Sequence, residues 1–281
     1  GQKICRDLFE AGFELRMADV TSPRAEDRAL GEFMRCDTRT PSDVWSAVQG
    51  MDAVVHLAAW HSAHAPPVSD ATIFAVNVDG TFNVLEACKE FGIKSFVFAS
   101  SLAYGWHSVY AVTKVLGEDL CRAFREAVAG ASVVMLRYNK FVPCSYLEFG
   151  TRLLGNGVDR RDVSSATVAA LRAACDHKVD LFTTVVSNKN DDMPESVVDD
   201  FQRNGQVWME EKLQGASKLV EKYSIRLPER IEEWYDLSEM ERVLGWKPTV
   251  GFIDFLIDLK RRDVRDEDVT KLWVASEIPS Q

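Results

Sequence analysis

The chain has 281 residues, with 43 acidic and 33 basic side chains, and a formal net charge of −10 at pH 7. Apolar residues make up 46% and charged residues 27% of the chain, which is typical of a globular protein and excludes a disordered one. The acidic balance argues against broad nucleic-acid binding, which needs a basic face. At roughly 150 residues per domain, the length predicts two domains or one large one.

Six cysteines are scattered along the chain, and none of them forms a C-x-x-C pair. This usage is typical of small core residues in a reducing compartment, so we expect a cytoplasmic protein. The apolar runs are far shorter than the roughly 20 residues of a membrane span. No signal-peptide pattern opens the chain, and we expect neither secretion nor a membrane partner.

The first half of the chain alternates predicted strands and helices. Apolar periodicity predicts helices at 2–11, 42–48, 73–91 and 110–127, and strands at 13–20, 32–36, 53–59, 95–100 and 132–137. The strands at 53–59 and 95–100 are nearly continuous apolar runs, as in parallel sheets buried on both faces. The alternation therefore predicts an α/β fold, a Rossmann-type doubly wound parallel sheet with helices on both faces.

The second half of the chain is less regular and mostly helical. Its pattern predicts a helix at 161–175, a strand at 180–186, and helical stretches at about 196–201, 207–223, 238–244 and 252–262. We find no internal repeat and no low-complexity tract. The pattern predicts a smaller, mostly helical domain after the sheet.

Gly1 and Asp19 have the spacing of a dinucleotide site. Gly1 opens the first predicted helix, and Asp19 ends the strand that follows. In dinucleotide-binding folds the phosphate-binding turn begins the first helix, and an acidic residue about 20 positions further on binds the ribose. An Asp repels a ribose phosphate, so this pair favours NAD over NADP. A helix-capping glycine and a loop aspartate would give the same pattern.

Tyr110 and Lys114 form a Y-x-x-x-K motif at the start of a predicted helix. The i, i+4 spacing puts both side chains on one helix face. An ordinary phenol has a pKa of about 10, too high for a base at neutral pH, and a neighbouring ammonium lowers it. Tyr110 can then take a proton from a sugar hydroxyl while hydride leaves the same carbon. Such a pair also arises by chance, so the motif alone is a weak signal.

Two serines, Ser100 and Ser101, follow the predicted strand at 95–100. A hydroxyl at the carboxyl end of a strand faces the ligand crevice of an open α/β sheet. Either hydroxyl suits the substrate oxygen beside Tyr110. Counting from the strand favours Ser101, whereas counting back from Tyr104 favours Ser100. An ordinary pair of serines at a strand end remains the alternative.

These residues occur in one order with several other motifs. The other motifs are His56-Leu57-Ala58-Ala59, Asn77-Val78-Asp79-Gly80-Thr81, Tyr104-Gly105, Leu136-Arg137-Tyr138-Asn139, and the run from Tyr235 to Pro248. The order resembles the extended short-chain dehydrogenase/reductases, specifically the NAD-dependent epimerase/dehydratase group typified by UDP-glucose 4-epimerase. The resemblance extends from Gly1 to about Leu259 and is more specific for fold and cofactor than for substrate.

The resemblance implies NAD as cofactor and gives the motif residues their roles. It makes Tyr110 the acid/base, Lys114 the group that binds the nicotinamide ribose and lowers the tyrosine pKa, and Ser101 the hydroxyl on the reacting oxygen. The implied cofactor-binding residues are Gly1, Asp19, Asp37, Leu57, Ala58, Ala59, Asn77, Ser100, Tyr110, Lys114 and Tyr138. The implied substrate-binding residues are Trp60, His61, Ser101, Asn139 and Arg160, where Arg160 is a diphosphate ligand or a surface charge.

The chain also departs from the family pattern. The family's first strand and first two glycines precede the position of Gly1, and the stretches near Trp106 and Pro143 are short. We therefore expect that segments of the protein are missing from this sequence. Leu102-Ala103 stands where the family's dehydratases carry Asp-Glu, which argues against a dehydratase. His61 and His64 have no further ligand cluster beside them, so no metal site is expected.

Three functions compete. The first is a nucleotide-sugar epimerase that oxidises a sugar carbon to a ketone and returns the hydride to the other face. The second is a net dehydrogenase or reductase of a sugar, uronate or other secondary alcohol. The third is a non-catalytic NAD-binding regulator, although such relatives typically lose the tyrosine or the lysine.

The resemblance also implies two domains and a dimer. Residues 1–139 and 158–186 are expected to form the NAD-binding Rossmann domain, and 140–157 and 187–281 the substrate-binding domain. Apolar residues cover more than one stripe of the helices at 73–91 and 110–127, as in helices buried on two sides. The family pairs these helices between subunits, so a homodimer is implied.

Overall fold

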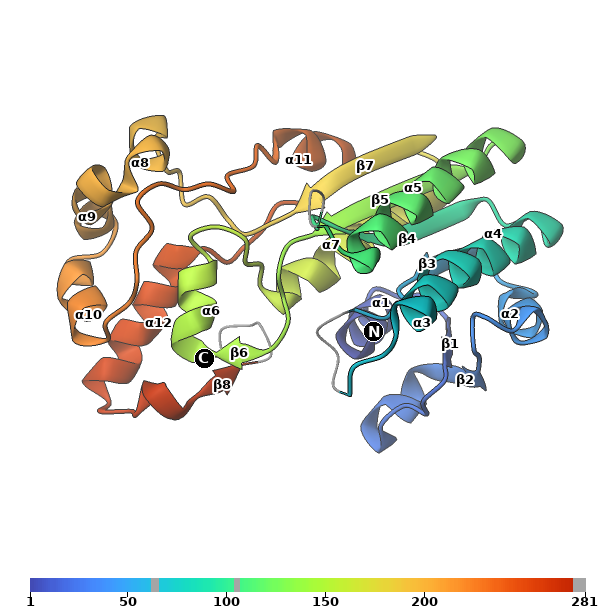
Figure 1. The fold of residues 1–281 in the computed structure, drawn as a ribbon, viewed down its shortest axis with the longest axis horizontal. Coiled ribbons are helices and arrows are strands. Elements are labelled where there is room, and N and C mark those ends of the chain that lie inside the picture. Colours follow the sequence, from blue (N-terminus) through green and yellow to red (C-terminus); the bar gives the residue numbers. More distant parts are fainter. Residues whose placement is uncertain (62–65, 104–106, 275–281) are drawn as a thin grey trace. The chain divides into compact units, whose positions relative to one another are not determined.

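The computed structural model describes residues 1–61, 66–103 and 107–274, and the chain forms two compact units (Figure 1). Unit 1 comprises Gly1–Arg137, Thr167–Thr184 and Arg242–Gly245, and unit 2 comprises Tyr138–Ala166, Val185–Glu241 and Trp246–Gln281. The expected stretches around Trp106 and His64 lie outside the described residues. The assignment of NAD binding to one domain and substrate binding to the other stays a prediction.

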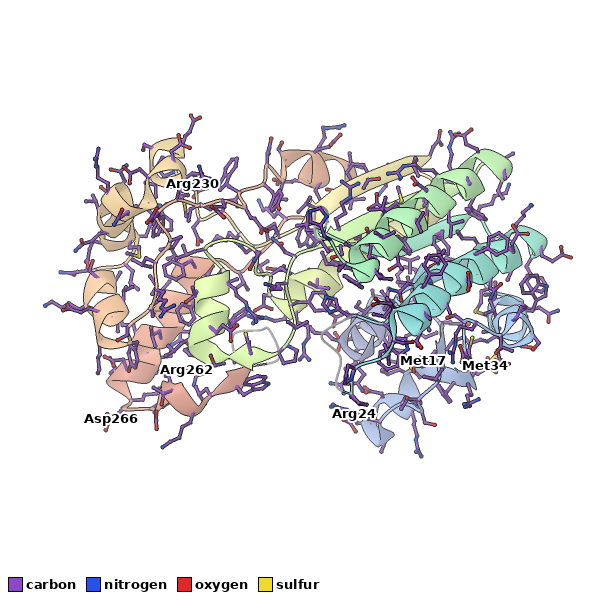
Figure 2. All side chains as sticks on the ribbon, viewed as in Figure 1. Met17, Arg24, Met34, Arg230, Arg262 and Asp266 are labelled. Atoms are coloured by element: carbon purple, nitrogen blue, oxygen red, sulfur yellow. The ribbon has the colours of Figure 1, made fainter. Side chains whose placement is uncertain are left out.

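The strands of unit 1 form two sheets. Strands β1 (Leu15–Asp19) and β2 (Gly31–Arg35) make a parallel pair, marked by Met17 and Met34 in Figure 2. Strands β3 (Ala53–His56), β4 (Ser95–Ser101), β5 (Ser132–Tyr138) and β7 (Leu181–Val186) form a second sheet in the order β3-β4-β5-β7. The pairing of β3 with β4 is parallel. The α/β class with a parallel sheet is confirmed.

The division into two sheets differs from the single sheet that the sequence predicts. Among the described residues, β1 pairs only with β2, and β3 pairs only with β4. The expectation that the protein has a further strand ahead of Gly1, as the family does, stays a prediction.

Helices cover the strands of unit 1. They are α1 (Gln2–Glu10), α2 (Pro41–Val48), α3 (Asp70–Phe74), α4 (Gly80–Glu90), α5 (Val109–Ala127) and most of α7 (Arg160–Cys175). Buried apolar side chains of α2, α4 and α5 pack against Phe96 and Phe98 of β4. At Gly117 a Cβ atom would collide with the ring of Phe98, so this glycine lets α5 lie directly on β4.

Most elements predicted for the first half are confirmed within a few residues, and one differs in kind. The helix predicted at 73–91 is two α-helices, α3 and α4, joined by a π-helical turn at Ala75–Asp79. A 3₁₀ helix at Ala25–Leu30 was not predicted. Apolar spacing reports the buried face of a helix but does not resolve one extra residue in a turn.

Unit 2 is mostly helical. It contains α6 (Tyr146–Arg152), α8 (Glu195–Asp199), α9 (Phe201–Lys212), α10 (Ala216–Lys222) and α12 (Phe252–Val264), with α11 (Ser238–Leu244) shared between the units. Strands β6 (Cys144–Ser145) and β8 (Trp273–Val274) form an antiparallel pair. Its core gathers aromatic side chains, among them Tyr146, Phe201 and Phe255.

The helical stretch predicted at 207–223 is broken in the structure. It forms α9 and α10, separated at Gly215, whose φ of +86° lies in the left-handed region that glycine adopts without strain. Helix α6 and the β6–β8 pair were not predicted. In the part of the chain that the structure describes, no helix combines the length and the apolar character that a membrane span requires.

Candidate active site

The carboxyl end of β4 separates the two serines. Successive side chains of a strand point to opposite faces. The Ser100 hydroxyl is buried and donates to the Glu118 carboxylate at 2.6 Å. The Ser101 side chain instead forms a hydrogen bond with Tyr110, and its oxygen accepts from the Ala103 amide at 3.1 Å. The geometry therefore favours Ser101 as the hydroxyl of the candidate site and gives Ser100 a role inside the fold.

Tyr110 and Lys114 lie on the first turns of α5, as their spacing predicts. The helix begins behind Ser108, whose side chain accepts from the Ala111 amide and caps the first turn. The Lys114 Nζ atom donates to the Ala99 carbonyl at 2.7 Å and lies 5.8 Å from the Tyr110 ring centroid. Ser101, Tyr110 and Lys114 therefore meet where β4 ends and α5 begins.

Burial dominates the acid–base properties of this cluster. Burial raises the pKa of Tyr110, and the hydrogen bond with Ser101 offsets part of that rise. Burial lowers the pKa of Lys114 to about 8. Lys114 therefore carries its charge at neutral pH but loses it more readily than an exposed lysine does. A positive charge close to a phenol favours the phenolate in general, and Lys114 is a charged group that lies near the Tyr110 ring.

Asn77 fixes the segment that follows β3. Its side-chain oxygen accepts from the Trp60 amide at 2.8 Å, and its nitrogen donates to the Trp60 carbonyl at 2.9 Å. The same nitrogen donates to Thr113 of α5 at 2.9 Å. The π-helical turn carries Asn77, and such turns occur frequently at functional sites. Asn77 thus links the segment after β3 to α5, and its predicted contact with the cofactor stays a prediction.

The segment held by Asn77 lies against Tyr110. The ring centroids of His61 and Tyr110 are 4.1 Å apart, with an interplanar angle of 54°. Trp60 packs on the small apolar cluster that contains Tyr110, Ile73 and Ala103. The structure therefore brings two of the residues predicted for substrate binding, Trp60 and His61, to the predicted acid/base.

His56 is a buried neutral imidazole beneath this cluster. Its Nε2 atom lies 3.0 Å from the Thr81 hydroxyl, which donates its own proton to the Asn77 carbonyl at 2.6 Å. The hydroxyl therefore accepts from His56, so Nε2 carries the hydrogen. Burial, reinforced by the charge of Lys114, lowers the pKa of His56 to about 3. Sequence reasoning found His56 only as part of a motif and missed this link to Thr81 and Asn77.

The predicted adenosine-binding carboxylates follow β1 and β2. Asp19 ends β1, is exposed, and accepts from the Thr21 amide at 2.9 Å. Asp37 is held by the Arg39 guanidinium through two bonds of 2.9 and 2.6 Å. That contact lowers the pKa of Asp37. The structure therefore leaves Asp19 open to solvent and gives Asp37 a partner that the sequence analysis did not anticipate.

Four other predicted cofactor residues of unit 1 lie ahead of α1 and directly after β3. Gly1 precedes α1, where a Cβ atom would meet nothing within 4 Å. Ala58 is exposed, and Leu57 and Ala59 are half-buried, directly after β3. Gly1, Ala58 and Ala59 place little side-chain bulk over the backbone at these positions.

Three predicted residues belong to unit 2. Tyr138 is buried with its ring edge toward Phe141, and the Asn139 side chain donates to Ser187 at 2.8 Å. Arg160 begins α7. Their predicted contacts with cofactor or substrate stay predictions.

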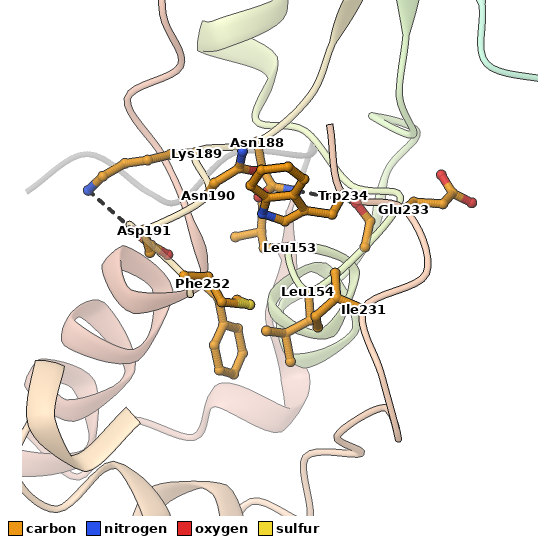
Figure 3. Close-up of a pocket in the computed structure, with 12 residues that line it drawn as sticks. Leu153, Leu154, Asn188, Lys189, Asn190, Asp191, Ile231, Glu233, Trp234 and Phe252 are labelled. Carbon is orange, nitrogen blue, oxygen red and sulfur yellow. Dashed lines mark hydrogen bonds and ion pairs between the residues drawn. The ribbon is translucent and has the colours of Figure 1, made fainter. Parts of the chain in front are cut away.

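Unit 2 also contains a narrow pocket that the sequence did not indicate (Figure 3). Its polar side chains are engaged by the protein itself. Asn188 donates to the Gly157 carbonyl at 3.0 Å, and Asn190 donates to the Tyr235 carbonyl at 2.8 Å. Lys189 pairs with Asp191 at 3.3 Å, as the dashed line in Figure 3 marks. This pocket offers a ligand few open groups.

Comparison with known proteins decides the family. A family model described as the NAD dependent epimerase/dehydratase family matches residues 1–160, more than half of the chain. The chain belongs to this family. The match covers β1 to β5, and so includes Asp19, Ser101, Tyr110 and Lys114.

Individual relatives to which this chain is similar include epimerases and dehydrogenases. An "Uncharacterized UDP-glucose epimerase YtcB" of Bacillus subtilis is 33% identical over 141 residues, covering 45% of this chain and 43% of the relative. A uronate dehydrogenase of Pseudomonas putida is 26% identical over 158 residues, covering 50% and 57%. The matched part of the chain thus spans about half the length of these relatives.

A solved structure shows the same fold. The UDP-glucuronic acid 4-epimerase from Bacillus cereus, in complex with NAD, matches with a TM-score of 0.60 and 21% identity, covering 91% of this chain and 92% of that one. At this identity the similarity supports the fold alone.

The residues of unit 1 suit the family's cofactor, NAD. An exposed carboxylate at Asp19 has acceptor capacity left for ribose hydroxyls. The ammonium of Lys114 has three donors, and one of them is used on Ala99. The loops after β2 and β3 contact one helical stretch, because Asn83 donates to Thr38 at 2.9 Å and Asn77 holds Trp60. Asp19 and Lys114, which are predicted to bind the two ends of a dinucleotide, therefore both belong to unit 1.

Proposed function

We propose that the protein is an NAD-dependent nucleotide-sugar epimerase that acts by transient oxidation of a sugar carbon to a ketone. The observation that carries the proposal is the cluster of Ser101, Tyr110 and Lys114 between β4 and α5. The family match and the printed names of its epimerase relatives support this reaction class. The substrate we propose is a nucleotide sugar.

In this proposal the protein moves one proton and holds one oxygen. Bound NAD supplies a hydride acceptor that returns the hydride later. Tyr110 takes the proton of the sugar hydroxyl and gives it back, and the Ser101 hydroxyl holds the same oxygen. Lys114 binds the nicotinamide ribose and favours the phenolate through its charge. Asp19 binds the adenosine ribose, and Gly1, Leu57, Ala58 and Ala59 line the diphosphate.

His61 and Trp60 complete the proposed site on the substrate side. Their segment is fixed against Tyr110 by Asn77, so neither side chain has to be ordered when a sugar binds. We assign Asn139 and Arg160 of unit 2 to the substrate's phosphates, and Tyr138 to the cofactor. Asp37 contributes its acceptor to the adenine amino group while Arg39 holds it in place.

A net dehydrogenase of a sugar, uronate or other secondary alcohol is the second candidate. The relative named uronate dehydrogenase favours it, and the same three residues serve both reactions. A non-catalytic NAD-binding regulator is a weaker third candidate, because both Tyr110 and Lys114 are present and meet in the structure. Leu102-Ala103 argues against a dehydratase.

The deciding experiment follows reduced nicotinamide and product sugars together. The enzyme is given NAD and a panel of UDP-, GDP- and dTDP-sugars plus free uronates. Interconversion of two sugars without accumulating NADH supports the epimerase. NADH that rises in step with loss of a substrate replaces it with the dehydrogenase. If the protein binds NAD but turns over no substrate, and Tyr110→Phe binds NAD as wild type does, the result supports the regulator.

We also propose a homodimer through α3, α4 and α5. Phe74, Phe82 and Val112 are 41%, 50% and 52% exposed on these helices, which pack on one another. Three large apolar side chains on neighbouring helices are typical of an interface between subunits. We expect Phe82→Asp to convert a dimer to monomers in light scattering, whereas Val207→Asp, at an exposed position of α9, leaves the mass unchanged. A monomeric wild-type protein would contradict the proposal.

A further inference from the structure

Glu118 is a completely buried carboxylate on α5 that accepts at least four hydrogen bonds. Its Oε1 atom accepts from the Ser100 hydroxyl at 2.6 Å and from Arg137 Nε at 2.8 Å. Its Oε2 atom accepts from Arg137 at 2.8 Å and from Arg122 at 3.0 Å. Two carboxylate oxygens offer about four acceptor positions, so the group is saturated.

Such a group is expensive to bury. An isolated carboxylate loses several kcal/mol on leaving water, and a buried ion pair often contributes no more stability than well-packed apolar residues would. The network is therefore poorly explained as a source of stability. Its geometry supports a different role.

Glu118 joins three elements at one point. It stands on α5, Ser100 is next to the last residue of β4, and Arg137 is next to the last residue of β5. On α5 it follows Lys114 by one turn and Tyr110 by two, on the same helix face. On β4 its partner Ser100 directly precedes Ser101. The carboxylate therefore links the strand end that carries one proposed catalytic residue to the helix that carries the other two.

We propose that Glu118 is a positioning residue, which acts through Ser100 to hold Ser101 at the right place for Tyr110 and Lys114. This inference rests on the proposed function of that cluster. Arg137 and Arg122 hold the carboxylate itself, so that its Oε1 atom faces Ser100. Lys114 contributes a second tie to the same strand end through Ala99, one residue earlier.

The first test removes the Ser100 hydroxyl and leaves the ion pairs intact. We expect Ser100→Ala to lower kcat about tenfold, because small misplacements of reacting groups cost rate, with KM within about twofold. The matched control is Ser95→Ala on the same strand, whose buried hydroxyl donates to the Ala174 carbonyl at 3.2 Å. It loses a comparable hydrogen bond far from Ser101, and we expect its kcat to stay at the wild-type value.

A second readout does not depend on turnover. Among the described residues, the polar or titratable side chains that interact with the Tyr110 side chain are His61 from the segment after β3, Ser101 from β4 and Lys114 from α5. Because the Ser101 hydrogen bond lowers the pKa of Tyr110, displacement of Ser101 raises it. The ultraviolet titration of each protein minus its Tyr110→Phe counterpart isolates this phenol. We expect a higher pKa in Ser100→Ala than in wild type or Ser95→Ala.

Glu118→Gln tests the carboxylate directly. The amide nitrogen faces donors of Arg137 or Ser100, so we expect a larger loss of kcat than in Ser100→Ala and the same direction of change in the phenol pKa. Glu126→Gln is the control, an exposed carboxylate on the same helix. If Glu118→Gln does not fold, Ser100→Ala still decides the matter.

The outcomes separate this inference from the proposed function. If Ser100→Ala matches Ser95→Ala in both kcat and phenol pKa, the positioning role is overturned whatever the reaction proves to be. If Tyr110→Phe turns over substrate as fast as wild type, the proposed function fails. The phenol titration then still shows whether Ser100 controls the contact between Ser101 and Tyr110.

Discussion

The ends of β4 and of β1–β2 both carry predicted site residues, and the protein builds them in opposite ways. At the end of β4, Ser100, Lys114 and Glu118 are buried and bonded to the protein. At the ends of β1 and β2, Asp19 and Arg39 are exposed, and the carboxylates bond to their own loops.

Under the proposed function, this difference follows from what each region has to do. Proton transfer needs groups held within a few tenths of an ångström in a low dielectric, which requires burial and a network of supports. Binding the hydroxyls of a ribose needs only acceptors open to the ligand. Substitutions at the β4–α5 junction are therefore expected to change rate, and those after β1 and β2 to change affinity.

The largest effect is expected at Tyr110. Because general acid–base catalysis contributes about 10² to 10⁴ in rate, Tyr110→Phe should lower kcat by about 10² to 10⁴, with NAD affinity unchanged. Stopped assays of product sugar and fluorescence titration of NAD measure the two quantities. Tyr223→Phe in unit 2 removes a comparable phenol, which bonds to Asp263, and should leave both at wild-type values. If the kcat of Tyr110→Phe is within tenfold of the wild-type value, Tyr110 is not the acid/base.

Substitution of Lys114 should show that its buried charge lowers the stability of the folded protein at the β4–α5 junction. Burial lowers its pKa to about 8 in the folded protein, below the value of an unfolded lysine. The folded state therefore loses this proton before the unfolded state does, and stability rises as pH increases from about 8 to 10.5. Lys114→Met should abolish that rise and increase the free energy of unfolding at pH 7 by about 3 kcal/mol or less, while turnover is lost.

Urea unfolding at pH 7 and pH 10 measures this effect. Lys94→Met is the control, a surface lysine at the other end of β4 whose substitution should leave the difference between the two pH values as in wild type. A Lys114→Met protein that is less stable than wild type at pH 7 would mean that the bond to Ala99 outweighs the burial of the charge.

Asp19 should affect the cofactor alone. Asp19→Asn removes the charge that we propose binds the ribose hydroxyls and repels a ribose phosphate, so NAD should bind about tenfold more weakly, and NADP should bind more tightly relative to NAD. Titrations with both cofactors measure the ratio, and Asp7→Asn on α1 is the control. An unchanged ratio of NAD to NADP affinity would mean that Asp19 does not bind the ribose. It would also contradict the expectation that substitutions after β1 and β2 change affinity.

The sequence predicted Tyr110 and Lys114 of the β4–α5 cluster better than Glu118, the buried residue that bonds to Ser100, and Arg137, which bonds to Glu118. Periodicity and the Y-x-x-x-K spacing placed Tyr110 and Lys114, since both depend on one helix. The preference for Ser101 over Ser100 depends on which face of β4 each side chain takes, and the sequence did not show that Ser100 donates to Glu118. Glu118 and Arg137 are far apart in the chain, so no local pattern pairs them.

The less accurate predictions have a common physical cause. The break of 207–223 at Gly215 and the π-helical turn at Ala75–Asp79 are local backbone choices that apolar periodicity does not encode. The bond of Asp37 to Arg39 was also missed, although the two residues are only two positions apart. Charged neighbours in a loop pair or separate according to backbone geometry, which the sequence does not state.

The smallest expected effect concerns the partly exposed ion pair in the loop after β2. Arg39 forms two short hydrogen bonds to Asp37, and Arg137 likewise bonds to Glu118. Arg39 and Asp37 are partly exposed, whereas Glu118 is fully buried. Water compensates an exposed charge, so Arg39→Gln should lower the free energy of unfolding by less than about 1 kcal/mol, whereas breaking the buried pair with Arg137→Gln should cost about 3 kcal/mol or more. Urea unfolding of both variants measures the contrast. Equal losses would mean that the loop after β2 is as tightly specified as the β4–α5 junction, and the two regions would then differ in exposure without differing in rigidity.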